Sequence, residues 1–189
     1  QEVRVLIVKS LCEKAFSAGI DVDYVKDISP FGIRDVGRLL HKCFGRLRRC
    51  DKPIIACIDG LCLGAGLELA ISCDLLVASN RSKFGLPNIN VGIPAIVEAA
   101  VLIQAVGVFH TRELCYTGKF WNAEKAFDRG LLNRMEKPEN LETSLMELAE
   151  NIASKSPSAL STQKEIIFKW MTTDLESAID YSINTVCLN

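Results

Sequence analysis

Hydrophobic and polar positions follow two different periods in the first half of the chain. Short apolar runs over residues 3–8, 54–58 and 75–78 have the length and the β-branched content of buried strands. Between residues 33 and 50, apolar side chains recur every three or four positions, with basic residues between them, which predicts a helix. Strands that alternate with helices in this way indicate an α/β core.

The second half of the chain is predominantly helical in its pattern. The nearly all-apolar segment 95–106 predicts a helix that is buried on most sides. Residues 141–154, 158–171 and 174–187 each show the apolar stripe of an amphipathic helix. We therefore expect a helical extension that follows the α/β core.

The clearest chemical signal lies between Ile54 and Ala70. An apolar strand runs into an Asp-Gly turn, and the small residues 64–66 then lead into a helix that carries Glu68. Amides at a helix N-terminus can donate to a developing oxyanion, and small side chains let a ligand approach them. An oxyanion donor beside a general base is the core of enolate and acyl chemistry.

Composition narrows the classes of protein that remain. The 189 residues carry a net charge of −1, so the chain lacks the excess of positive charge that is typical of nucleic-acid-binding proteins. No apolar run is long enough to span a membrane. With 49% hydrophobic residues and a mean hydropathy of +0.19, either most of the chain is buried or apolar surface is covered in an oligomer. The eight cysteines form no Cys-x-x-Cys pair and lie near no histidine cluster, which indicates a reducing intracellular compartment and no metal site.

Several sequence blocks, in this order, resemble the crotonase superfamily, the group of enoyl-CoA hydratases and isomerases. The blocks are Lys14–Asp21, Ile58–Gly60 with Gly64–Ala70, Cys73–Asp74, Lys83–Pro87, Gly92–Pro94, Leu114–Gly118 and Ala123–Leu132. The resemblance runs from Val3 onward and implies a core of stacked ββα turns over residues 1–135. It also implies a C-terminal helical region, 136–189, that makes subunit contacts in a trimer or hexamer. The family's opening hairpin and helix are missing, so we expect a fragment.

The resemblance further implies a coenzyme A thioester as substrate, with no bound cofactor. In the family, two backbone amides bind the thioester oxygen, and by position these are the N–H groups of Ile20 and Ala65. Coenzyme A itself would lie along a set of residues in the same two loops: Lys14, Ala15, Ala18, Gly19, Asp21 and Gly64.

One position departs from the pattern of the family's hydratases, which use two glutamates. The first corresponds to Glu68, but the second falls on Asn88, and an amide cannot exchange a proton at neutral pH. Glu98 is the nearest further acid and stands alone in an apolar segment. We expect Glu68 to be the principal acid/base, Glu98 its candidate partner, and Asn88 to orient water or substrate. Glu98 could equally reach solvent or pair with an arginine or lysine of a neighbouring subunit.

The sequence thus predicts hydration or double-bond shift of an enoyl-CoA through an enolate. Two alternatives stay open. A thioester hydrolase or decarboxylase would use the same two amides to bind the thioester oxygen. A non-catalytic acyl-CoA-binding protein would retain the fold without the chemistry.

Overall fold

The computed structural model describes residues 3–186, which form two four-stranded sheets. The strand orders are β1-β3-β5-β8 and β2-β4-β6-β7, and every neighbouring pair is parallel except β6 with β7. The strands are β1 (Leu6–Lys9), β2 (Ala15–Ser17), β3 (Ile54–Ile58), β4 (Leu61–Leu63), β5 (Leu75–Ser79), β6 (Lys83–Gly85), β7 (Trp121–Asn122) and β8 (Arg134–Glu136).

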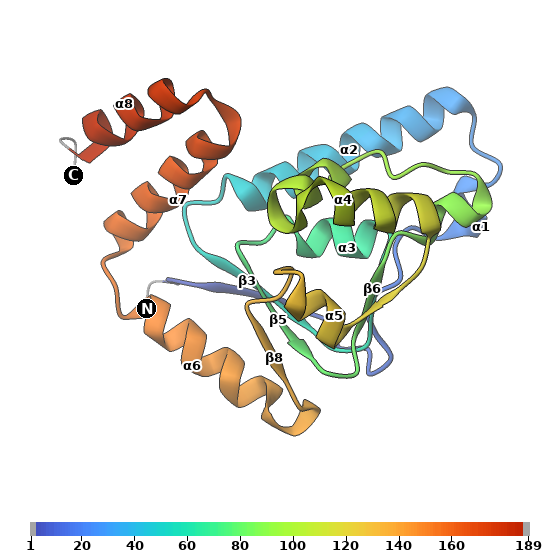
Figure 1. Cartoon of the computed structure of the whole chain (residues 1–189), viewed down its shortest axis with the longest axis horizontal. Helices are drawn as coiled ribbons and strands as arrows, with labels where there is room; N and C mark the ends of the chain where they lie inside the picture. Colours follow the sequence, from blue (N-terminus) through green and yellow to red (C-terminus); the bar gives the residue numbers. More distant parts are fainter. Residues whose placement is uncertain (1–2, 187–189) are drawn as a thin grey trace.

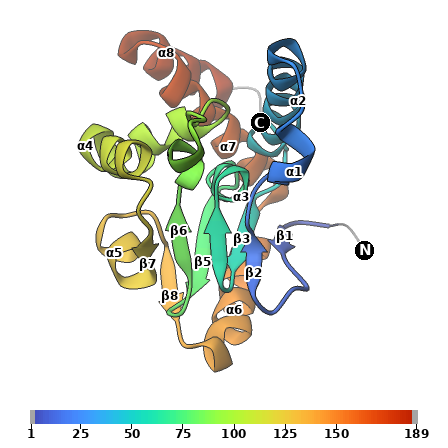
Figure 2. The same ribbon diagram turned by 90° about the vertical axis from the view of Figure 1, so that its right-hand side faces the viewer.

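Each of the first three strand pairs, β1–β2, β3–β4 and β5–β6, places one strand in each sheet before the chain enters a helical segment. Successive turns therefore pair in parallel in both sheets. Ile55 pairs with Leu75 in one sheet, and Leu61 pairs with Lys83 in the other. The result is the predicted spiral of ββα turns. Figure 2 shows the strands side by side, with α2, α3 and α4 above them and α6 below in that view.

Helices cover both sides of the sheets and continue as an arm formed by α7 and α8 (Figure 1). Their bounds are α1 (Val22–Val25), α2 (Pro30–Arg48), α3 (Ala65–Ala70), α4 (Leu102–Thr117), α5 (Ala123–Asp128), α6 (Leu141–Ala153), α7 (Pro157–Thr172) and α8 (Leu175–Val186). Short 3-10 turns occur at Pro87–Val91, Ala99–Val101 and Pro138–Asn140. No helix within residues 3–186 combines the length and the apolar character that a bilayer crossing requires.

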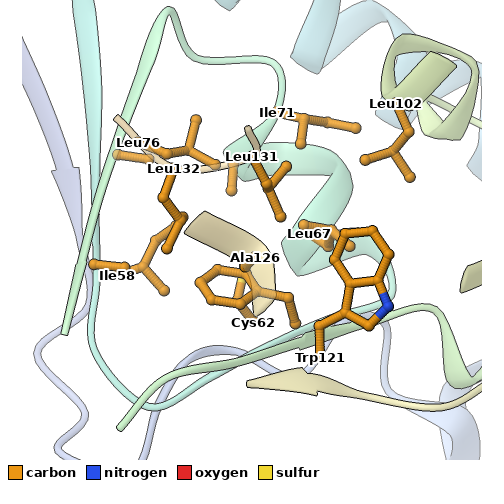
Figure 3. Packing of buried hydrophobic residues seen from close by; sticks show 14 of the residues in the cluster. Ile58, Cys62, Leu67, Ile71, Leu76, Leu102, Trp121, Ala126, Leu131 and Leu132 are labelled. Atoms are coloured by element: carbon orange, nitrogen blue, oxygen red, sulfur yellow. The ribbon is translucent and has the colours of Figure 1, made fainter. Parts of the chain in front are cut away.

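The core is built on β3, all of whose residues are buried. Ile58 and its alternate neighbours on this strand face the side chains of α3 and α5, together with Leu76 and Trp121 (Figure 3). Ile55 and Cys57 face the opposite side, where Leu145 of α6 covers them. Side chains of a strand alternate between its two faces, so an uninterrupted apolar run lets β3 serve two hydrophobic layers.

The predicted helix over residues 95–106 is wrong in its first half. Residues 93–98 have no regular secondary structure, a 3-10 turn follows, and α4 begins only at Leu102. The reason is a long-range contact, because the amides of Val97, Glu98 and Ala99 donate to the side chain of Glu68. Within α4, Gly107 has non-helical dihedral angles, φ 79° and ψ 164°, and kinks the helix.

Other predicted elements are found with small shifts of their ends. The first strand begins at Leu6 and not at residue 3, and the helix predicted over 33–50 runs from Pro30 to Arg48. Ser29 caps that helix by accepting from the Gly32 N–H, and the proline at its first position needs no donor there. The last residue of the helix predicted over 174–187 lies outside the described residues.

Candidate active site

A cavity of about 220 Å³ lies between α2, the N-terminus of α3 and the segment that follows β6. Most of its wall is aliphatic. Two polar side chains line it among the described residues, Glu68 and Asn88. Much of the apolar lining comes from α1, α2, the 3-10 turn that ends at Val91 and the segment before α4: Val25, Ile33, Val36, Leu40, Val91, Ile93, Ile96 and Val97. A mostly apolar cavity with few polar groups is the usual form of a small-molecule site.

Two loops meet at the floor of this cavity, and glycine is required where they touch. A Cβ atom on Gly19, whose φ is +99°, would lie 3.0 Å from Leu63 O and 3.2 Å from Ala65 N. A Cβ atom on Gly66 would lie 2.5 Å from Ser17 O. The loop after β2 therefore packs against the beginning of α3 at backbone distance, which a larger residue would prevent.

Ile20 and Ala65 belong to the two segments that meet in this contact. Both residues line the cavity, and within residues 3–186 neither N–H donates to an acceptor. The neighbouring Gly64 N–H is used differently, since it donates to Gly85 O at 2.9 Å. The site thus offers two main-chain donors that a ligand oxygen could accept from.

Glu68 presents a fixed carboxylate to the same cavity. The residue is only 4% exposed, and its Oε1 accepts from the amides of Val97, Glu98 and Ala99 at 3.3, 3.0 and 3.1 Å. Burial raises the pKa of Glu68 above its ordinary 4.5, although the three amide bonds act in the opposite direction. A carboxyl group with a raised pKa is suited to proton exchange near neutral pH.

Asn88 places an unpartnered acceptor beside these groups. Its Oδ1 is buried and accepts no hydrogen bond from the described residues, and a Cβ atom on Gly64 would lie 3.4 Å from it. Leaving a buried polar atom unpaired costs about 1–3 kcal/mol. Because Asn88 lines the cavity, the cost is offset when a bound molecule donates to it.

Glu98 lies behind the cavity and is not among its described lining residues. Its carboxylate forms an ion pair with the guanidinium of Arg48, and its Oε1 lies 2.6 Å from Nδ1 of His41. The structure therefore brings Glu98 into contact with Glu68 through its own backbone N–H and pairs its carboxylate with an arginine of the same chain.

The residues expected along coenzyme A divide into two groups. Ala18, Gly19 and Gly64 line the cavity. Lys14, Ala15 and Asp21 do not line it: the Lys14 side chain is exposed, Ala15 lies within β2, and Asp21 Oδ1 accepts from the Asp23 N–H at 2.9 Å. Among residues 3–186, no three His, Cys, Asp or Glu side chains gather as a metal site would require.

Sequence reasoning missed three side chains beside the site, those of Arg48, His41 and Ser72. Arg48 and His41 both reach the Glu98 carboxylate from α2. Ser72 Oγ donates to the carbonyl of Glu68 at 2.8 Å and accepts from Arg48. Helical spacing could have placed Arg48 and His41, seven residues apart, on one face of α2.

Comparison with known proteins agrees with this geometry. The profile of the enoyl-CoA hydratase/isomerase family matches residues 1–186. The chain is 34% identical to the short-chain-enoyl-CoA hydratase of Clostridium acetobutylicum, over 95% of this chain and 69% of the relative. It is also 34% identical to the crotonyl-CoA hydratase of Syntrophomonas wolfei, over 94% of this chain and 68% of the relative.

Solved structures show the same likeness. An enoyl-CoA hydratase from Thermoplasma volcanium superposes with a TM-score of 0.93 at 28% identity, over 100% of this chain and 75% of that one. Human enoyl coenzyme A hydratase domain-containing protein 3 superposes with a TM-score of 0.88 at 30% identity, over 98% and 73%. With its fold, cavity and sequence in agreement, the chain belongs to the enoyl-CoA hydratase/isomerase family.

Proposed function

We propose that the protein adds water across the α,β double bond of a short-chain enoyl-CoA thioester. One observation carries the proposal: a buried carboxylate, Glu68, lines one apolar cavity together with Ile20 and Ala65, whose amides have no acceptor among residues 3–186. The two relatives named short-chain-enoyl-CoA hydratase and crotonyl-CoA hydratase support the reaction and the substrate class.

The proposed reaction begins with the thioester carbonyl, whose oxygen accepts from the N–H groups of Ile20 and Ala65. This polarisation makes Cβ electrophilic and stabilises the enolate that forms when water adds there. One such donor is typically worth about 10²–10³ in kcat. The apolar wall from α2 strengthens both hydrogen bonds because it excludes water from the reacting atoms.

Glu68 exchanges the protons in this scheme. Its carboxylate takes a proton from water as the water oxygen bonds to Cβ, and the resulting carboxylic acid returns that proton to Cα of the enolate. One carboxyl group thus serves first as base and then as acid, a contribution of about 10²–10⁴ in rate. Asn88 Oδ1 is buried and has no partner in the described part of the chain; it accepts from the attacking water and orients it without exchanging a proton.

Double-bond isomerisation is a second candidate, and Asn88 is the observation that favours it. Glu68 is the one carboxylate among the described lining residues of the cavity. Moving a proton from Cγ to Cα of an enoyl-CoA requires one shuttling base and no water. The same oxyanion donors would stabilise the intermediate dienolate.

We also propose where coenzyme A binds, in which kind of compartment the protein works and how it assembles. Coenzyme A runs from the cavity along Lys14, Ala15 and Asp21, and no further cofactor takes part. The protein works in a reducing compartment as a trimer or hexamer. Exposed apolar residues on α8 support self-association: Leu175 and Ile179, one helical turn apart, are 71% and 45% exposed.

The test is to incubate the purified protein with crotonyl-CoA and follow the loss of conjugated-thioester absorbance. Chromatography of the products separates 3-hydroxybutyryl-CoA from free coenzyme A, which a hydrolase would release. A 3-enoyl-CoA substrate reports isomerisation by the gain of the same absorbance. Binding of several acyl-CoA esters without turnover would instead favour the non-catalytic acyl-CoA-binding protein.

The Glu68→Gln variant tests the assignment of the proton carrier. We expect kcat to fall by about 10³-fold or more, while the affinity for unreactive butyryl-CoA changes by less than about threefold. Glu142→Gln is the matched control, because Glu142 is an exposed carboxylate on α6 paired with Lys9. Wild-type turnover in Glu68→Gln would refute the assignment.

A further inference from the structure

The residues that bind the Glu68 carboxylate lie in a short turn before α4. Three successive amides, at residues 97–99, point at one oxygen of Glu68. The chain before them, from residue 93, has no regular secondary structure. The backbone bonds of the 3-10 turn lie after them, from the Val101 N–H to Glu98 O at 2.9 Å and from the Leu102 N–H to Ala99 O. Consecutive N–H groups can all point at one oxygen only when surrounding contacts hold the backbone in place.

Glu98 supplies that contact from within the turn. Its side chain is 4% exposed, and both of its carboxylate oxygens bind the guanidinium of Arg48. Arg48 comes from the last turn of α2 and is itself only 15% exposed. A two-pronged pair between a carboxylate and an arginine fixes orientation as well as distance, because both groups are planar. His41, 59% exposed, adds a bond to Glu98 Oε1 from one face of the same helix.

Arg48 also reaches the helix that carries Glu68. Its Nη1 donates to Ser72 Oγ at 3.4 Å, and Ser72 Oγ donates to the Glu68 carbonyl at 2.8 Å. One guanidinium therefore contacts the turn that binds the carboxylate and, through Ser72, the backbone of the residue that bears it. Neither Arg48 nor Glu98 is among the described residues that line the cavity.

We infer that Arg48 and Glu98 are positioning residues for the reaction: their buried ion pair holds the amides of residues 97–99 in place, and those amides aim the Glu68 carboxylate into the cavity. The inference rests on the proposed role of Glu68 as acid/base. It assigns Glu98 a role that acts through its backbone, in place of direct proton exchange with the substrate.

The kinetic test uses Arg48→Met and Glu98→Gln with crotonyl-CoA. Since a displacement of about 1 Å at the reacting group can cost 10²-fold in rate, we expect kcat to fall by about 10- to 100-fold with KM within about twofold. The matched control is Lys9→Met, which breaks the exposed Lys9–Glu142 pair between β1 and α6 and should leave both constants unchanged. A wild-type kcat in Arg48→Met or in Glu98→Gln, or a change confined to KM, would overturn the inference.

A second readout needs no turnover. Hydrogen–deuterium exchange of a peptide spanning residues 95–102 should accelerate by about tenfold in Arg48→Met, because the amides at 97–99 lose their fixed bonds to Glu68. If the wild type fails to hydrate crotonyl-CoA, the proposed function falls while this measurement still decides the positioning role. Unchanged exchange would overturn that role.

Arg48→Lys keeps the test decisive if Arg48→Met does not fold. Lysine retains the positive charge but cannot bind both oxygens of Glu98 in the planar arrangement seen here. We expect kcat and the exchange rate of residues 95–102 to lie between those of the wild type and those of Glu98→Gln. Values equal to the wild type in both measurements would overturn the inference.

Discussion

Glu68 sits under two opposing influences at the residue scale. Burial penalises its ionised form, whereas three backbone amides favour it, and the balance leaves its pKa above the ordinary value. Asp74 is a comparison within the same chain, since burial also raises its pKa while Lys164 acts against the shift. The two carboxylates differ in their access to a ligand. Glu68 lines the cavity, whereas Asp74 is bound to Lys164 and to the Ile54 N–H.

The pH profile of kcat/KM follows from the direction of this shift. Glu68 must be ionised to accept the first proton, so activity should fall as pH drops through its pKa. Because that pKa is raised, the acid limb should have its midpoint above 4.5. Stopped-flow or steady-state rates between pH 4 and 9 measure it, and a midpoint at or below 4.5 would contradict the assignment.

Glu68→Gln should also change stability in a pH-dependent way. A raised carboxyl pKa means that the folded protein binds this proton more tightly than the unfolded chain, so ionisation above the unfolded pKa lowers stability. The glutamine variant avoids that loss. Its Tm should exceed the wild-type Tm by about 1–3 °C at pH 8, and the difference should vanish near pH 4. A lower Tm at pH 8 would contradict this.

Asn88 gives a second residue-scale prediction, because its Oδ1 is buried and no described residue donates to it. Asn88→Leu removes that atom at similar volume, so Tm should stay level or rise by about 1–3 °C. Hydration of crotonyl-CoA should fall by about 10- to 100-fold, while butyryl-CoA binds within about threefold of wild type. A large loss of Tm, or undiminished hydration, would show that the amide has another role.

At the scale of elements, local pattern was enough where the element depends on its own residues. The apolar runs at 54–58 and 75–78 lie in strands, as their pattern alone predicts. The segment that begins at residue 95 is different, because the amides of residues 97–99 bind a side chain about 30 positions earlier. The Arg48–Glu98 pair, 50 positions apart, is hidden from the sequence for the same reason. Periodicity reports burial, not which distant polar group a turn will bind.

The contact between the β2 loop and α3 can be tested with one pair of glycine substitutions. A Cβ on Gly66 would lie 2.5 Å from Ser17 O, whereas one on Gly37 of α2 would meet only Ile96 Cδ1 at 3.8 Å. Gly66→Ala should lower Tm by about 3–10 °C and reduce kcat, because the loops must separate. Gly37→Ala should raise Tm by about 1–3 °C. Equal Tm values for the two variants would contradict the packing described here.

At the scale of the whole molecule, apolar surface remains on the helices that end the chain. Leu175 and Ile179 lie on one face of α8, and Trp170 of the preceding helix is also more than half exposed. Light scattering should give a mass three or six times the 20.8 kDa of one chain. Leu175→Glu combined with Ile179→Glu should shift it toward one chain. A wild-type mass of 20.8 kDa would contradict the proposed assembly.

The most direct test of the oxyanion site is a crystal structure with butyryl-CoA, a saturated thioester that cannot be hydrated. We predict the thioester oxygen within about 3 Å of the backbone nitrogens of both Ile20 and Ala65. The Glu68 carboxylate should face Cα and Cβ of the acyl chain. A thioester oxygen bound elsewhere, with those two N–H groups turned away from it, would contradict the proposed chemistry.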